Sequence, residues 1–346
     1  MAEETQPIEF SYSKQDEWAG KCGMDCDTAK RQSPIDIPKS TASVTDDGRP
    51  LLQLNQHKKT IWTLKNTGTA AVMSINKEAD RPILTGGALK GEYKFDHFTF
   101  HWGAKEGEGS EHSYDKANFD GEIHYQFTLQ GDPAEGEDPV VILCLNMKMR
   151  SDGGKTSMMG IQEKLGEIKE FQASTEIPNS DFLRVIIACF TDSDYFQYQG
   201  SLCHPPCTEN VTYIVFEKPG EFSNIMFEHF REMKGSDGEP IKSNHREKRF
   251  ELGDRAVTRT KHVRRKRSDM KSGTKAEEVA PAEPGAPEEE SKKVGEDEKP
   301  AETKPEGEEE PKPEAEEAKP EDEEKKPEAE KKEEEEENKE DKPAEE

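Results

Sequence analysis

The sequence predicts a β-dominated α+β domain followed by a long, disordered, acidic tail. Short segments rich in aromatic and β-branched residues recur up to about residue 257, bounded by Gly, Pro, Asn or Asp, and this pattern is typical of strands. Two longer segments repeat apolar residues at three and four positions, which is the period of a helix. From residue 276 onward the chain has no aromatic residue, so that part cannot bury enough apolar surface to become ordered.

Predicted strands outnumber predicted helices. The strands are TIWTLKN (60–66), AAVMSI (70–75), HFTFHW (97–102), IHYQFTL (123–129), VVILCLNMKM (140–149), LRVIIACF (183–190) and VTYIVF (211–216). The helices are GIQEKLGEIKEFQA (160–173) and FSNIMFEHFREMK (222–234). The sequence shows no internal repeat, so these elements are expected to form one domain.

Charge and hydropathy exclude two classes of partner. The 346-residue chain has a formal net charge of −26, most of it in the tail, and we expect no nucleic-acid partner. No apolar run approaches the roughly 18 residues of a membrane span. The opening segment MAEETQPIEF is acidic and has no apolar core, so it does not have the form of a secretory signal.

The cysteines nevertheless favour an oxidising compartment. Four lie near the two ends of the domain, placed to cross-link distant segments: Cys22, Cys26, Cys203 and Cys207. Cys144 and Cys189 lie inside apolar runs and are interpreted as ordinary core thiols. We therefore expect an extracellular, secreted protein. The alternative is that the disulfide interpretation is wrong and the protein is cytoplasmic.

Residues 97–126 carry the candidate metal chemistry. Alternate residues of a strand share one face. The faces so defined are His97, Thr99 and His101 on one strand and Glu122, His124 and Gln126 on the next. Imidazoles from neighbouring strands, backed by carboxylates such as Glu111 and Glu122, form the pattern that a zinc site requires. The alternative is a pair of half-buried histidines in an ordinary sheet.

From about Phe10 to Arg255 the sequence resembles the α-carbonic anhydrase family. Five stretches match in order: QSPIDI (32–37), LTGGALKGEYKFDHFTFHWG (84–103), GEGSEH (107–112), GEIHYQ (121–126) and GSLCHPPCTENVTYIVF (200–216). The resemblance implies that family's fold, a large central, mostly antiparallel twisted sheet with peripheral helices. The expected organisation is a flexible N-terminus (1–9), a carbonic anhydrase-like domain (10–262), a basic junction (263–275) and a disordered Glu/Lys/Pro-rich tail (276–346).

The resemblance also implies a zinc site that lacks one ligand. The family binds zinc through three histidines, two in an HFHWG strand and one in a second strand. His101 and His124 match two of them, and Thr99 occupies the place of the third. Threonine is not an ordinary zinc ligand, and two imidazoles hold zinc weakly. Without bound zinc, no water is activated at neutral pH.

By the same resemblance, part of the surrounding machinery is kept and part is changed. Glu122 orients a histidine ligand, and Glu111 and His112 match the pair that supports the catalytic gate. At the gate itself, Cys203 replaces a threonine and His204 replaces the residue after it. A thiol is a weaker hydrogen-bonding group than a hydroxyl, so alignment of a zinc-bound hydroxide should suffer.

Two further changes fall in the same site. Thr69 stands where fast members of the family have a proton-shuttle histidine, so no shuttle is expected. Gln126 stands at a position that is apolar in the family's CO2-binding wall. This concentration of departures in one site favours a relaxed or redirected function.

A rebuilt metal site is the alternative. Thiolate is an excellent zinc ligand, so His101, His124 and Cys203 could hold the ion together. His97 is a weaker candidate, because it lies about 7 Å along the strand from Thr99 and matches a polar residue behind the metal. Two functions follow: a weakly active or inactive carbonic anhydrase-like binding or matrix component, or an active zinc lyase that converts CO2 and water into bicarbonate and a proton.

Secreted members of the family imply a disulfide between Cys26 and Cys207. Cys22 has no family counterpart, and it either pairs with Cys203 or stays free. A Cys22–Cys203 bridge would exclude Cys203 as a metal ligand, so these two hypotheses compete. The sequon Asn210-Val-Thr212 is a doubtful glycosylation site because it falls within a predicted strand.

The junction and tail carry their own hypotheses. VRRKR (263–267) is interpreted as a processing site that frees the tail, with a nuclear-localisation-like patch or a solvated end of the fold as alternatives. Dense carboxylates in the tail attract Ca2+ collectively, without a preformed site, and the alternative is a purely solubilising extension. By analogy with acidic appendages in calcifying matrices, the tail is a candidate for contact with calcium or a mineral surface.

Overall fold

The computed structural model describes residues 9–21, 29–45, 50–55, 57–152, 156 and 158–261. The predictions made for Cys22, Cys26, the basic junction and the acidic tail lie outside these residues. Within the described ranges, no helix is both long enough and apolar enough to cross a membrane.

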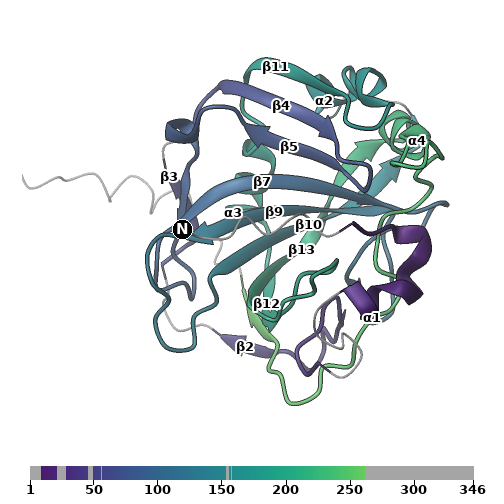
Figure 1. The fold of residues 1–346 in the computed structure, drawn as a ribbon. Coiled ribbons are helices and arrows are strands. Elements are labelled where there is room, and N and C mark those ends of the chain that lie inside the picture. Colours follow the sequence, from purple (N-terminus) through teal and green to yellow (C-terminus); the bar gives the residue numbers. More distant parts are fainter. Residues whose placement is uncertain are drawn as a thin grey trace, which may run out of the picture. The chain divides into compact units, whose positions relative to one another are not determined.

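One twisted sheet of twelve strands dominates the described chain (Figure 1). Its strands are β2 (Ser43–Thr45), β3 (Gln53–Asn55), β4 (Thr60–Asn66), β5 (Ala71–Ile75), β6 (Ile83–Thr85), β7 (Tyr93–Trp102), β9 (Gly121–Leu129), β10 (Val140–Arg150), β11 (Ser174–Ser180), β12 (Tyr195–Gly200), β13 (Val211–Ser223) and β14 (Thr258–Thr260). In space they run β11-β4-β5-β7-β9-β10-β13-β12-β14-β2, with β6 pairing both β3 and β7. Most neighbours are antiparallel, whereas β10–β13 and β14–β2 are parallel. The predicted fold class is confirmed.

Short elements surround this sheet. They are η1 (Tyr12–Glu17), α1 (Trp18–Lys21), η2 (Glu78–Asp80), α2 (Met159–Gln162), η3 (Leu165–Ile168), α3 (Arg184–Asp192), α4 (Asn224–Glu232) and a two-stranded parallel sheet of β1 (Asp36–Ile37) and β8 (Ser113–Tyr114). The helix predicted at 222–234 is confirmed as α4, and the Ser223 hydroxyl caps it by accepting from the Ile225 N–H. The continuous helix predicted at 160–173 is wrong: the chain forms the short α2 and η3 instead. Gly166 lies in this stretch and weakens helix by about 1 kcal/mol relative to alanine.

The strand predicted at 183–190 is also wrong, because this segment forms α3. Its buried apolar residues are Leu183, Ile186 and Phe190, spaced by three and four positions as on one helix face. The β-branched residues of the segment favoured a strand, but β-propensity depends strongly on context. Here the helical spacing of the buried face was the better indicator.

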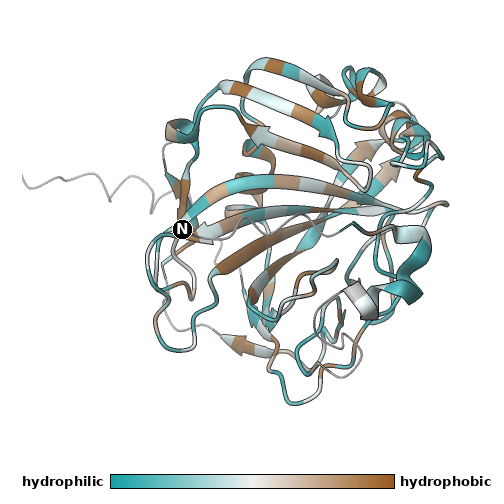
Figure 2. Cartoon of the chain, in the orientation of Figure 1, coloured by the Kyte–Doolittle hydropathy of each residue, from teal (hydrophilic) through white to brown (hydrophobic). Residues whose placement is uncertain are grey.

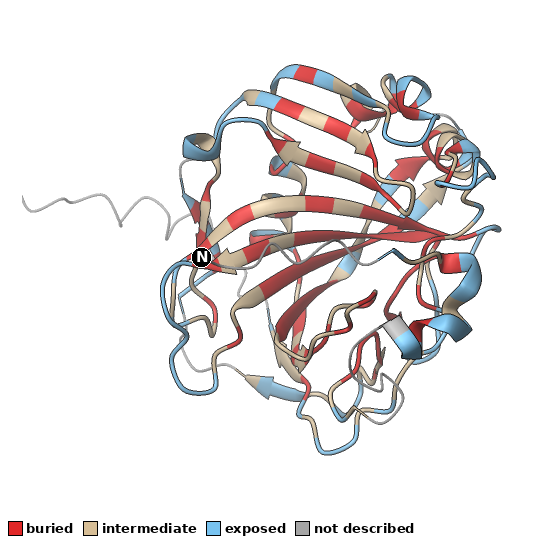
Figure 3. Ribbon diagram, viewed as in Figure 1, coloured by how far each residue is buried: buried red, intermediate tan, exposed pale blue. Residues whose placement is uncertain are grey.

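The central strand β7 separates two environments. Phe98, Phe100 and Trp102 are fully buried in the larger apolar core, whereas the alternate residues Thr99 and His101 line a small cavity. Figure 3 shows that buried positions concentrate on the central strands, and Figure 2 shows that β10 is largely hydrophobic. The two-residue period of a strand therefore supplies an apolar support on one face and a polar site on the other.

Strand β4 offers a matched pair of substitutions that tests this packing. Leu64 is 0% exposed and Ile61 is 45% exposed. Leu64→Ala should lower the free energy of unfolding by about 2–5 kcal/mol because it leaves a cavity in the core. Ile61→Ala should change it by less than about 0.5 kcal/mol. Urea denaturation measures both, and equal losses would contradict the assigned faces of β4.

Candidate active site

A cavity of about 180 Å³ lies over the polar face of the central strands. Eight of the residues that line it are among those that the sequence predicts for the site: Thr69, His97, Thr99, His101, His124, Gln126, Cys203 and His204. The structure adds others that sequence reasoning missed, namely Phe10, Tyr12, Thr67, Ala70, Val72, Ile142, Leu202 and Tyr213. Residues separated by more than a hundred positions thus meet at one cavity.

The antiparallel register of β7 and β9 sets the positions of the candidate ligands. Thr99 lies opposite His124, and His101 lies opposite Glu122. The imidazole rings of His101 and His124 have their centroids 4.4 Å apart. The threonine therefore stands directly across from one retained histidine and two residues along the strand from the other.

His101 and His124 are each oriented by contacts that one of the two ring nitrogens makes. His101 Nδ1 lies 2.9 Å from the carbonyl oxygen of Asn244 and 3.1 Å from Oε1 of Glu111. His124 Nε2 lies 2.9 Å from Oε1 of Glu122. These contacts leave Nε2 of His101 and Nδ1 of His124 as the nitrogens that can face a ligand, which is the arrangement by which proteins orient metal-binding histidines.

Burial and neighbouring charges shift the pKa values of His101 and His124 in opposite directions. Burial and the nearby His101 lower the pKa of His124 to about 4. Burial also acts to lower the pKa of His101, but the hydrogen bond and negative charge of Glu111 outweigh it and raise that pKa. His101 in turn holds the pKa of Glu111 below its usual value, against the effect of burial. The metal-free site therefore favours a neutral His124 at neutral pH.

Behind His124 lies a fully buried carboxylate network. Glu122 accepts from the backbone N–H of His112 at 2.8 Å and lies 2.6 Å from Nδ1 of that ring. Burial would raise the pKa of Glu122, but His112 and His124 hold it well below the ordinary range. The other nitrogen of His112, Nε2, lies 2.6 Å from the Tyr198 hydroxyl, which donates to Ser33.

The predicted gate residue Cys203 lies in a buried part of the cavity wall. Cys203 is a buried thiol, with Sγ 3.2 Å from the Tyr213 hydroxyl. Burial and the nearby Glu111 raise the pKa of this thiol well above its usual value. Glu111 makes its described contacts elsewhere: it accepts from the Arg246 N–H at 3.0 Å and faces His101.

The cavity also contains an aromatic pair. The ring of His204 stacks on Phe10 with centroids 5.6 Å apart and planes 2° from parallel. His204 Nδ1 lies 2.9 Å from the Pro205 carbonyl oxygen, and burial lowers the pKa of His204. The Thr69 hydroxyl lies 3.3 Å from that of Thr67, so two neighbouring hydroxyl groups line this part of the cavity.

The donor set of the cavity does not fit a three-histidine zinc centre. It supplies two imidazole nitrogens and, at the third place, the hydroxyl of Thr99. Among the described residues, a different group brings the ligand atoms of His, Cys and acidic side chains within 4.8 Å of one another: His112, Glu122, His124 and Cys144. Cys144 is buried, as expected of a core thiol, but it also lies directly opposite His124 in the β9–β10 register. That pairing was the signal that sequence reasoning missed.

The remaining site predictions fall partly outside the described residues. Cys203 has a free thiol, and Cys207 is buried close to it in the chain. Cys26, the predicted partner of Cys207, and Cys22 are not among the described residues. Asn210 immediately precedes β13 and is half-buried, and its Oδ1 atom is enclosed. The disulfide and the glycosylation site stay predictions.

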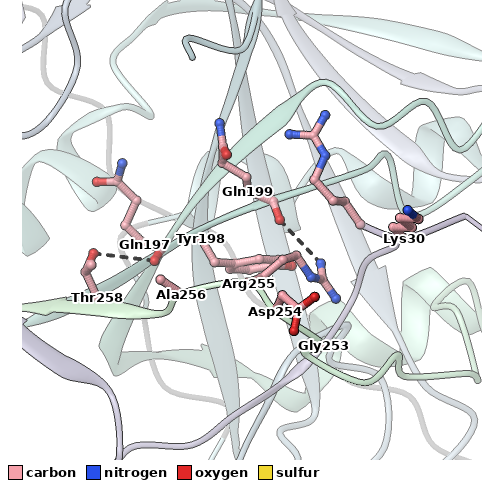
Figure 4. Close-up of a pocket in the computed structure, with 10 residues that line it drawn as sticks. Lys30, Gln197, Tyr198, Gln199, Gly253, Asp254, Arg255, Ala256 and Thr258 are labelled. Carbon is pink, nitrogen blue, oxygen red and sulfur yellow. Dashed lines mark hydrogen bonds between the residues drawn. The ribbon is translucent and has the colours of Figure 1, made fainter.

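A larger, open hollow of about 810 Å³ lies elsewhere on the described surface. Figure 4 shows its polar lining, with Arg255 reaching the carbonyl oxygen of Gln199 at 3.3 Å. The same nitrogen, Nη1, also donates to the carbonyl oxygen of Gln32, and Nε and Nη2 donate to the carbonyl oxygens of Leu252 and Glu251. These contacts give Arg255 a structural role, and the hollow contains none of the cavity's histidines.

A twelve-stranded sheet with histidines projecting from its central strands into a small cavity is the architecture of a carbonic anhydrase. A family model described as eukaryotic-type carbonic anhydrase matches residues 13–261. The chain belongs to this family.

Similarity to individual relatives is modest. Human mitochondrial carbonic anhydrase 5B is 31% identical over 209 residues, which is 58% of this chain and 63% of that protein. Mouse carbonic anhydrase 7 is 28% identical over 209 residues, covering 59% of this chain and 77% of the relative. The Caenorhabditis elegans protein named "Putative carbonic anhydrase 3" is 26% identical over 249 residues, covering 72% of this chain and 96% of the relative.

In the metal-free protein, His101 and His124 should titrate on opposite sides of the ordinary histidine pKa. Nitrogen-detected NMR should give His124 a pKa near 4 and His101 a pKa above 6.5. At pH values between about 4 and the ordinary histidine pKa of 6.5, the folded chain therefore binds fewer protons at His124 than the unfolded chain does. His124 therefore lowers the free energy of unfolding as the pH falls through that window.

Glu111→Gln supplies the check on this assignment. It removes the charge that favours protonated His101, so the pKa of His101 should fall. A pKa for His101 that is unchanged by the substitution would contradict the proposed cause.

Proposed function

We propose that this protein is a carbonic anhydrase-related protein that hydrates CO2 slowly or not at all and uses the inherited cavity for binding. The observation that carries the proposal is the position of Thr99 directly opposite His124, where the resemblance calls for a third histidine. A hydroxyl is a poor replacement for an imidazole in a zinc centre.

Hydration of CO2 at neutral pH depends on a metal-bound water of lowered pKa. Zinc supplies that chemistry in this family when three protein ligands hold it and a fourth position stays open. At the three places where the family has histidine ligands, this chain offers two imidazoles, those of His101 and His124. A protein that retains zinc weakly lacks the activated water that attacks CO2. Tight binding of the substrate does not replace this nucleophile.

The rest of the cavity supports the same proposal. The Cys203 thiol, 3.2 Å from the Tyr213 hydroxyl, is a weaker hydrogen-bonding group than a gating hydroxyl. Thr69 has no titratable group for proton transfer, and Gln126 adds an amide to the lining. Each change removes a separate contribution to the reaction, so restoration of one is expected to recover only part of it.

The second candidate function is an active zinc lyase with a rebuilt ligand set. Its support is the presence of Cys203 in the same cavity as His101 and His124. Coordination would require the buried thiol to lose its proton, and burial disfavours the thiolate in the metal-free protein. The first candidate is therefore preferred.

Thr99→His tests the preferred function. We expect stopped-flow CO2 hydration by the zinc-supplied wild-type chain to lie near the uncatalysed rate. The substitution should raise kcat/KM at least about tenfold, equivalent to about 1.4 kcal/mol of transition-state stabilisation, and should raise retained zinc. Fast turnover by the zinc-loaded wild-type chain would overturn the proposal.

Thr69→His is the matched control for that experiment. It adds a histidine to the same cavity, at the place of the proton shuttle, without adding a metal ligand. Alone it should leave the rate at baseline, because no zinc hydroxide is present to lose a proton. Combined with Thr99→His, it should raise the rate beyond that of the single variant. A gain from Thr69→His alone would show that metal was already bound productively.

We further propose that the protein acts outside the cell as a matrix component. The supporting features are the cysteines at both ends of the domain and the composition of residues 276–346, which combine many carboxylates with no aromatic residue. An acidic segment of this kind attracts calcium through its overall charge, with no fixed coordination geometry.

Calcium titration of the full chain tests the role of the tail. We expect many weak sites whose affinity falls steeply with added salt, because the attraction is collective and screened. A full-length variant in which the acidic residues of 276–346 are replaced by their amides should lose this binding. Equal calcium uptake by both proteins would contradict the proposed role.

A further inference from the structure

We propose that this chain binds a zinc-class transition-metal ion in a closed site behind the cavity, held by His112, Glu122, His124 and Cys144. The four residues come from the GEGSEH segment, β9 and β10, and all are buried. Their ligand atoms lie within 4.8 Å of one another. The site goes beyond the proposed function, because metal binding at this place is structural and does not depend on CO2 chemistry.

The strand pairing delivers the four donors to one point. Cys144 on β10 lies directly opposite His124 on β9, and directly opposed side chains project on the same face of a sheet. Glu122 is two residues from His124 and shares that face. Its Oε1 atom lies 2.6 Å from His112 Nδ1 and 2.9 Å from His124 Nε2.

The donor set matches the preference of zinc. Two imidazole nitrogens, one carboxylate oxygen and one sulfur complete a tetrahedral shell. Bond lengths of about 2.0–2.3 Å place neighbouring ligand atoms roughly 3.3–3.6 Å apart. The contacts of 2.6 and 2.9 Å around Glu122 therefore need to widen by less than about 1 Å. Ligand atoms that are as much as 4.8 Å apart need to approach by roughly 1.2–1.5 Å.

A chain of hydroxyl groups favours a cation at this place. Tyr198 donates its single hydroxyl proton to Ser33, so His112 Nε2 must donate to Tyr198 across their 2.6 Å contact. Nδ1 of a neutral His112 then carries a lone pair and faces the Glu122 carboxylate. Two acceptors at 2.6 Å require a proton or a metal ion between them.

Charge balance favours the closed site over the cavity. A divalent ion held by the Glu122 carboxylate and the Cys144 thiolate leaves no net charge in the interior. An ion held in the cavity by two neutral imidazoles would have no anionic ligand of its own, because the carboxylates of Glu111 and Glu122 contact the far nitrogens of those rings. The protein interior therefore favours the donor set that includes one carboxylate and one thiolate.

Binding of the metal ion releases protons from its ligands. The ion forms bonds to His112 Nδ1, Glu122 Oε1, His124 Nε2 and Cys144 Sγ. Burial and the nearby Glu122 raise the pKa of the Cys144 thiol well above its usual value in the metal-free protein, so the bound ion must displace this proton, which leaves to solvent. The proton on His124 Nε2 is transferred through cavity water to Nδ1, so that ring stays neutral. A proton between His112 Nδ1 and Glu122 is released in the same step.

An ion held by these four residues would be structural and not catalytic. Four protein ligands leave no open position for water, which is the property that separates structural zinc from catalytic zinc. The closed site uses Nε2 of His124, the nitrogen that contacts Glu122 and faces away from the cavity.

Cobalt substitution with a matched pair of cysteine variants tests the site. Thiolate ligation of Co2+ gives a near-ultraviolet charge-transfer absorption that histidine and carboxylate ligands do not give. We expect the full-length wild-type chain to bind one Co2+ with this absorption. Cys144→Ser should abolish the absorption, and Cys203→Ser, a substitution of another buried thiol, should retain it.

Two outcomes would overturn the proposal. Loss of the absorption in Cys203→Ser with retention in Cys144→Ser would assign the ion to the cavity. Absence of bound metal from the folded wild-type chain would leave the four residues as a hydrogen-bonded network only. Neither readout is catalytic, so the result is separate from the CO2 hydration assays.

Crystallography of the wild-type protein covers the case in which Cys144→Ser fails to fold. Crystals grown with zinc should show an anomalous difference peak at the zinc absorption edge between His112 and Cys144. A peak between His101 and His124 on the cavity side, or no peak in the domain, would contradict the closed site.

Discussion

The antiparallel pairing of β7 with β9 decides the chemistry of this protein, because it determines which polar side chains meet. It sets Thr99 against His124 and His101 against Glu122. A slip of β7 by one residue would turn Thr99 and His101 to the opposite face of the sheet, where Phe98 now packs in the core. The aromatic residues that stabilise the sheet therefore also hold the polar site in place.

The two buried acids of the site, Glu111 and Glu122, are held by contacts that do not include Thr99. Glu111 accepts from Arg246 and faces His101, and Glu122 is bonded to His112 and His124. An unpartnered buried carboxylate would cost several kcal/mol, but none of these contacts involves Thr99. The described contacts of both carboxylates therefore do not depend on the side chain at position 99.

Local periodicity was enough to predict much of the fold and the candidate site. Alternation in β7 placed Thr99 and His101 on one face without knowledge of any partner strand, and the structure brings both to the cavity. The position of Cys144 required the β9–β10 register, a long-range pairing that a single sequence does not specify. The strand predicted at 183–190 is wrong for a different reason. The β-branched residues of this segment favour a strand, but Ile186 and Phe190 have the spacing of one helix face.

The stack of His204 on Phe10 links the beginning of the domain to the segment between β12 and β13. Both rings line the cavity, so any rearrangement of one changes the wall that the other provides. The N-terminal segment is therefore a working part of the cavity wall. A fusion partner, label or affinity tag joined close to Phe10 would alter ligand access as directly as a substitution inside the cavity.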